Sequence, residues 1–75
     1  MKVGKVLKQL RKKAGYTQRD LAKRTELTST TIGLIERDIS IPWPSTLAKI
    51  CRVLKTRPSV VHRMAIDAQD EQSEN

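Results

Sequence analysis

The sequence predicts an all-α fold made of five short helices, and three observations lead to it. Apolar residues recur at three- and four-residue steps along most of the chain, which places them on one face of a helix. Threonine or serine precedes several of these runs, where a hydroxyl group can cap a helix N-terminus. Glycine or proline separates most of the runs, where helices commonly end or begin.

The first helix is expected over residues 3–14, because one apolar stripe runs along it. Gly15 follows, and glycine readily adopts the left-handed backbone that ends many helices. The stripe contains Val3, Val6, Leu7, Leu10 and Ala14, and the lysines expected to face outward are Lys5, Lys8, Lys12 and Lys13.

Residues 17–36 predict two further helices joined by a tight turn. Thr17 can cap the first of them, and either Thr28 or Ser29 can cap the second. The inward-facing residues are Leu21 and Ala22 in the first helix and Ile32 and Ile35 in the second. Only three or four residues remain for the connection, which is centred on Glu26 and Leu27. This arrangement is a helix-turn-helix, a unit that lays its second helix in the DNA major groove.

A loop and two more helices are expected after residue 36. Pro42 and Pro44 cannot lie inside a helix, Ser45 and Thr46 lead into the fourth helix, and Pro58 suits the first turn of the fifth. The apolar faces contain Leu47, Ile50, Cys51 and Leu54 in the fourth helix and Val61, Met64, Ala65 and Ala68 in the fifth. We therefore expect one folded domain over residues 1–66 and an acidic, disordered tail over residues 67–75.

The charge of the 75-residue chain is strongly basic and unevenly distributed. Lysine and arginine number 15 against 8 acidic residues, a net charge of +7. Residues 1–66 hold all 15 basic and 4 acidic side chains, a net charge of +11, while residues 67–75 hold the other 4 acidic ones. A folded part this basic suits a polyanion such as nucleic acid, although a solubilising surface is the plainer explanation of charge alone.

Several classes of protein find no support in the sequence. No apolar run reaches 18 residues and no signal-peptide pattern opens the chain, so we expect neither a membrane span nor secretion. Cys51 is the only cysteine, which fits a reducing, cytoplasmic setting, and a buried inert thiol is expected there. His62 has no partner at metal-ligand spacing, and no nucleophile–base set is visible. We expect no cofactor, no metal and no enzymatic activity.

From Val3 to about His62, the chain resembles the Cro, phage-repressor and XRE family of DNA-binding domains. The matching residues are Gly4, Leu7, Leu10, Arg11, Gly15, Thr17, Gln18, Leu21 and Ala22, followed by Thr31, Ile32, Ile35, Glu36, Pro42, Leu47, Ile50 and Leu54. The resemblance implies a five-helix, lambda-repressor-like domain whose second and third helices form the helix-turn-helix. It also implies double-stranded DNA as the partner.

The resemblance also suggests which residues contact DNA. Gln18 holds the place of a glutamine that meets the DNA backbone, and a helix N-terminus offers free N–H groups to phosphate there. Arg19 and Ser40 are further backbone candidates, and Arg37 can reach a phosphate or a groove edge. The groove-facing positions correspond to Ser29, Thr30, Gly33 and Leu34, with Thr31 beside them. None is arginine, glutamine or asparagine, the residues that discriminate bases best, so we expect weak direct readout and a reliance on DNA shape.

At Gly33 and Trp43 the sequence leaves alternatives open. Gly33 would either let the helix approach DNA or a partner closely, or it is a tolerated small residue without a role. Trp43, the only tryptophan, is expected to be an apolar plug over the fourth helix rather than a DNA contact.

Four further positions are expected to shape the scaffold. The resemblance implies that Arg11 and Glu36 form a salt bridge, which holds the reading helix to the first helix. Glu26 and Asp38 stand where the family usually has glycine, so each must adopt a strained backbone or a different turn.

The sequence-based hypothesis is a sequence-preferring transcriptional regulator, a repressor that binds its operator as a homodimer. One domain of about 11 Å radius cannot span half-sites about 34 Å apart, so a symmetric dimer is expected. The candidate dimer residues are Val60, Val61, Met64 and Ile66. The alternative is an adaptor or antitoxin whose main partner is a protein, such as a toxin, with DNA binding secondary.

Overall fold

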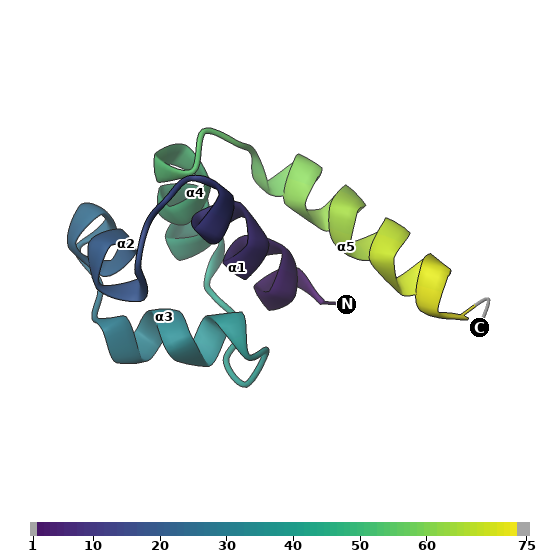
Figure 1. Cartoon of the computed structure of the whole chain (residues 1–75), viewed down its shortest axis with the longest axis horizontal. Coiled ribbons are helices and arrows are strands. Elements are labelled where there is room, and N and C mark those ends of the chain that lie inside the picture. The colour runs from purple at the N-terminus through teal and green to yellow at the C-terminus, as the bar shows by residue number, and fades with distance from the viewer. Residues whose placement is uncertain (1, 74–75) are drawn as a thin grey trace.

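Five α-helices joined by short connections make up residues 2–73, the part of the chain that the computed structural model describes (Figure 1). The helices are α1 (Val3–Lys13), α2 (Gln18–Thr25), α3 (Ser29–Glu36), α4 (Pro44–Val53) and α5 (Pro58–Ser73). No strand occurs among these residues, so the predicted all-α, five-helix architecture is confirmed.

The core lies where all five helices meet. α1 packs against α3 and α5, while α2 packs against α3 and α4. Each helix contributes at least one of the large, fully buried side chains: Leu7, Leu21, Ile32, Ile50 and Val61. Burial of an aliphatic side chain stabilises a fold by about 1.5–3 kcal/mol, and these five residues belong to one buried cluster that holds the helices together.

Threonine hydroxyl groups begin both helices of the helix-turn-helix. The Thr17 Oγ1 accepts a hydrogen bond from the Asp20 backbone N–H at 3.0 Å, and the Asp20 carboxylate accepts one from the Thr17 N–H at 3.0 Å. This reciprocal pair is a capping box. Thr28, rather than Ser29, caps α3, since its Oγ1 accepts from the Thr31 N–H at 3.1 Å.

Left-handed residues end four of the helices. Gly15 has a φ of 85°, as predicted for the stop after α1. Glu26 (φ 59°), Asp38 (φ 57°) and Lys55 (φ 58°) adopt the same region without being glycine. Glu26 and Asp38 therefore form their turns in the left-handed backbone conformation, which non-glycine residues usually avoid.

Asp38 also holds the beginning of α1. Its Oδ1 accepts a hydrogen bond from the Gly4 backbone N–H at 2.9 Å, which satisfies one of the unpaired donors at that helix end. Lys2, the residue before α1, makes no side-chain cap of its own. A Cβ atom at Gly4 would collide with the Ile35 carbonyl oxygen, so glycine is required where α1 meets the end of α3.

Helix ends and burial differ from the sequence-based expectation in several places. α4 begins at Pro44, ahead of Ser45, because proline is well suited to the first helical position. α5 continues to Ser73, whereas a disordered segment was expected from residue 67; Ala68, Gln69 and Glu71 are good helix formers. Residues 74–75 of that predicted tail lie outside the described residues.

Another difference concerns the expected dimer surface. Val61 has 0% exposure, so it is a core residue, and the prediction that it is a dimer contact is wrong. Val61 lies one helical turn before Ala65, on the same buried face of α5.

Candidate nucleic-acid interface

A buried ion pair fixes α3 to α1. The Arg11 Nε donates to the Glu36 Oε2 at 2.6 Å and the Arg11 Nη2 donates to Oε1 at 3.1 Å. The Arg11 Nη1 also donates to the Tyr16 carbonyl oxygen at 2.7 Å. The two side chains are only 8% and 2% exposed. The structure thus contains the pair that the family resemblance implies, in a two-pronged geometry that fixes direction as well as distance.

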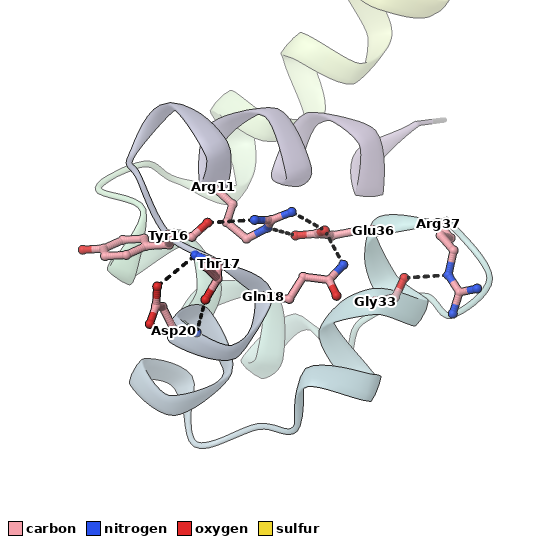
Figure 2. A network of polar contacts seen from close by, with 8 residues as sticks. All are labelled: Arg11, Tyr16, Thr17, Gln18, Asp20, Gly33, Glu36 and Arg37. Carbon is pink, nitrogen blue, oxygen red and sulfur yellow. Dashed lines mark hydrogen bonds and ion pairs between the residues drawn. The ribbon is translucent and has the colours of Figure 1, made fainter.

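Gln18 lies beside this pair at the start of α2 (Figure 2). Its Nε2 donates a hydrogen bond to the Glu36 Oε1 at 3.0 Å, and its side chain is half-buried. Because the carboxylate can only accept, the amide nitrogen must face it. The side chain predicted to meet the DNA backbone is therefore positioned by the carboxylate that holds α3.

The outer face of α3 is polar but uncharged. Ser29 and Thr30 are exposed, whereas Thr31 is half-buried and its hydroxyl lies 2.8 Å from the Thr28 hydroxyl. Thr31 therefore supports the cap of the helix, which leaves Ser29 and Thr30 as the free hydroxyl groups. Leu34 is half-buried. The predicted groove-facing residues share one helix but differ in accessibility.

Gly33 lies beneath the side chains of Gln18 and Arg37, which flank it in Figure 2. A Cβ atom at this position would lie 3.7 Å from the Gln18 Oε1 and 4.0 Å from the Arg37 Nη2. Both distances are ordinary van der Waals contacts, so packing inside the protein does not require glycine here. This contrasts with Gly4, where a Cβ cannot fit.

Arg37 follows α3 and is exposed, but its side chain folds back on the helix. The Nε donates to the Gly33 carbonyl oxygen at 3.2 Å, and the same oxygen also accepts from the Arg37 backbone N–H at 3.1 Å. The backbone N–H of Ser40 donates to the Leu34 carbonyl oxygen at 3.2 Å. That amide is engaged within the protein, so the exposed hydroxyl group is the part of Ser40 that remains available for DNA.

The loop between α3 and α4 exposes three large apolar side chains. Ile39, Ile41 and Trp43 are 66%, 90% and 78% exposed. The prediction that Trp43 plugs the surface of α4 is wrong. Trp43 is the residue just before α4, and its backbone carbonyl oxygen accepts from the Leu47 N–H at 2.8 Å while the indole projects into solvent.

The side chains of two arginines in α2 differ in whether the protein holds them in place. Arg19 is exposed at the beginning of the helix, beside Gln18. Arg24 lies over the Tyr16 ring, with its Cζ 4.8 Å from the ring centroid, so that guanidinium is held by a cation–π contact. Lys5 and Lys8 were expected to face outward but were not among the predicted DNA contacts, although their three-residue spacing places them on neighbouring positions of α1.

The described residues hold no group of three or more His, Cys, Asp and Glu side chains placed to bind a metal ion. None of the helices described is both long and apolar enough to cross a membrane. Cys51 is buried, and burial raises the pKa of its thiol, which keeps it neutral.

Comparisons with known proteins agree with this geometry. The helix-turn-helix family model matches residues 7–61. The HTH-type transcriptional regulator ImmR of Bacillus subtilis (strain 168) is 40% identical over 50 residues, which cover 67% of this chain and 39% of ImmR. The match thus spans well under half of the length of that curated relative.

Solved structures extend the comparison. The restriction–modification controller protein C.Esp1396I is 35% identical with a TM-score of 0.76, and the match covers 88% of this chain and 86% of that one. SinR, a master regulator for biofilm formation solved in complex with DNA, is 31% identical with a TM-score of 0.71, covering 80% and 92%.

The clp gene regulator ClgR from C. glutamicum shares the fold, with a TM-score of 0.82 at 24% identity over 88% of this chain and 86% of that chain. The match to the family model takes in most of the chain, including α2 and α3. This chain therefore belongs to the helix-turn-helix family, within the Cro, phage-repressor and XRE group that its sequence resembles.

Proposed function

We propose that the protein is a transcriptional regulator that binds double-stranded DNA with α3 in the major groove, and that it represses transcription as a homodimer. The observation that carries the proposal is the fixed position of α3. The Arg11–Glu36 pair holds it to α1, and Gln18 at the start of α2 shares the same carboxylate. The exposed Ser29 and Thr30 lie on its first turn, the end of a recognition helix that commonly contacts bases.

Phosphate contacts are expected to supply most of the affinity. Gln18 and Arg19 begin α2, where backbone N–H groups and the helix dipole favour an anion. Arg37 and Ser40 follow the C-terminal end of α3. Because Ser29 and Thr30 can each bond to several bases, DNA deformability is expected to contribute to the sequence preference.

A homodimer is expected because the chain has a single recognition helix, α3. An operator with two half-sites about 34 Å apart presents two binding positions. Val60, Met64 and Ile66 on α5 are 43%, 37% and 48% exposed and remain the proposed dimer residues. Light scattering is expected to give a dimer at high micromolar concentration. Ile66→Glu is expected to shift it to monomer, whereas a monomeric wild-type protein would contradict the dimer.

The DNA proposal is tested by binding in a salt series. Affinity is measured for the DNA upstream of the protein's own gene and for a scrambled duplex of the same length. A regulator is expected to show a steep salt dependence and a preference of at least about a thousandfold for the upstream DNA. A steep dependence without preference would contradict sequence-preferring regulation.

A second candidate function has one observation in its favour. Ile39, Ile41 and Trp43 form an exposed apolar segment, and such segments commonly mark protein interaction sites. An adaptor or antitoxin that binds a protein partner, such as a toxin, would use it. This candidate gains support if the salt series shows weak, salt-insensitive DNA binding.

A further inference from the structure

A concave basic surface lies between the first half of α1 and the end of α3. It encloses about 530 Å³ and is lined by Lys2, Lys5, Lys8, Glu36, Arg37 and Asp38. Lys5 and Lys8 lie three residues apart on neighbouring positions of α1, and Lys2 is the residue just before the helix.

The two carboxylates in this lining are already engaged within the protein. Glu36 accepts hydrogen bonds from Arg11 and Gln18, and Asp38 accepts one from the Gly4 backbone N–H. Among residues 2–68, whose side chains are described, none of the four cations in the lining forms an ion pair. Arg11 balances the charge of Glu36, while Asp38 keeps its charge because the Gly4 N–H is neutral, so the four cations leave the lining with an excess of positive charge.

The basic concavity is continuous with the proposed phosphate contacts. Glu36 is part of its wall and is hydrogen-bonded to Gln18 at 3.0 Å, while Arg37 closes it beside the end of α3. In Figure 2, Gln18 and Glu36 lie in the space between α1 and α3, and Arg37 lies beyond Gly33, beside the end of α3. A DNA strand that contacts Gln18 and Arg37 would thus run past the lysine side of α1.

We infer that Lys5 and Lys8, supported by Lys2, bind phosphates of the DNA backbone that flanks the bases read by α3. This inference rests on the proposed function and adds α1 to the DNA-binding surface. A lysine ammonium is a compact point charge on a flexible stem, so it neutralises phosphate without reading sequence. Lys5 and Lys8 therefore contribute affinity equally on every DNA sequence.

The test is the salt dependence of a double variant, Lys5→Gln/Lys8→Gln. Affinity for the upstream DNA and for a short mixed-sequence duplex is measured over a salt series. Each phosphate contact contributes about 0.9 to the slope of log K against log salt, so the slope is expected to fall by about 0.9–1.8 on both duplexes. The ratio of the two affinities is expected to stay the same.

A control variant removes the same charge elsewhere. Lys49→Gln/Arg52→Gln changes two exposed residues of α4, a helix that packs on α2 and α5. Its slope is expected to stay near the wild-type value. Thermal melts followed by circular dichroism are expected to show both variants folded, since all four side chains are exposed.

The possible results separate the two proposals. A variant slope equal to that of a DNA-binding wild-type protein overturns the inference alone, as does an equal fall in the control. A wild-type protein that binds neither duplex overturns the proposed function and the inference with it.

Discussion

Gln18 and Glu36 are joined by a hydrogen bond of 3.0 Å, although they lie 18 residues apart and begin and end the two helices of the helix-turn-helix. Glu36 is at the same time held by Arg11. One carboxylate therefore fixes both the reading helix and the side chain expected to meet the DNA backbone. Disturbing it should affect stability and DNA binding together.

Glu36→Ala is expected to lower the free energy of unfolding by about 3–5 kcal/mol, since it leaves the buried Arg11 charge without its partner. A small domain has only about 5–15 kcal/mol in total, so loss of DNA binding should follow from unfolding. Urea denaturation measures the change. The matched control is Glu26→Ala at an exposed position, expected to be mild, and a Glu36→Ala variant as stable as that control would contradict the role of the pair.

Gly33→Ala and Gly4→Ala are expected to change stability in opposite directions. At Gly33 a Cβ fits, so alanine should stabilise α3 by about 1 kcal/mol and raise the Tm by about 4–8 °C. At Gly4 the Cβ meets the Ile35 carbonyl oxygen, so alanine should destabilise the fold. Thermal melts compare the two variants, and a lower Tm for Gly33→Ala would show that this reading of α3 is wrong. DNA titration of Gly33→Ala then tests whether the glycine has a role in binding.

Asp38 combines a left-handed backbone with a hydrogen bond to Gly4. Asp38→Ala should lower the free energy of unfolding in two ways. Loss of the cap should cost about 0.5–2 kcal/mol. Alanine tolerates the left-handed backbone less well than aspartate, which should cost about 1 kcal/mol more. Asp38→Asn retains an accepting oxygen and a tolerant backbone, so it should stay close to wild type. Chemical denaturation that finds both variants equally stable would contradict the proposed cap.

Asp20 makes part of the stability depend on pH. The Thr17 backbone N–H, and then the Thr17 hydroxyl, hold the pKa of the Asp20 carboxyl below its ordinary value of 3.8. A lowered folded-state pKa means that this stabilisation is present above pH 3.8 and is lost as the pH falls through the folded value. The difference in Tm between the wild-type protein and Asp20→Asn should therefore shrink below pH 3.8. A difference that is constant with pH would exclude a contribution from the carboxylate charge.

Trp43 offers an intrinsic probe of the loop between α3 and α4. Because it is 78% exposed and is the only tryptophan, free protein should emit like a solvated indole and be quenched freely by acrylamide. Saturating DNA should reduce this quenching, since Ser40 and Arg37 of the adjoining segment are proposed DNA contacts. Unchanged quenching at saturation would mean that the loop faces away from DNA and would favour a protein partner for its apolar residues.

Local signals in the sequence predicted most of the scaffold. Thr17 and Asp20 form a capping box, and Gly15 adopts a left-handed backbone, because each effect acts within a few residues. The apolar stripes predicted the core residues Leu7, Leu21 and Ile32 for the same reason. The Arg11–Glu36 pair, by contrast, came only from the family resemblance.

Contacts between distant residues were not predictable in this way. The Gly4–Asp38 hydrogen bond joins residues 34 positions apart, and no local pattern indicates it. Trp43 is exposed and Val61 is buried because the path of the loop and the rotation of α5 decide burial, and hydrophobicity alone does not reveal either. The basic concavity needs α1 and the end of α3 to be placed side by side, which only the fold provides.

The sharing of Glu36 has a consequence for dissecting the molecule. A peptide containing only residues 17–36 would lack Arg11, so the Glu36 carboxylate at the end of its reading helix would have no ion-pair partner. The peptide would consist of two helices of eight residues each. Helices that short are marginal in water without tertiary packing. The helix-turn-helix is therefore not a portable unit that could be grafted by copying its own residues. Any transplant of its specificity would have to exchange only Ser29, Thr30 and their exposed neighbours, leaving the recipient's own first helix and carboxylate in place.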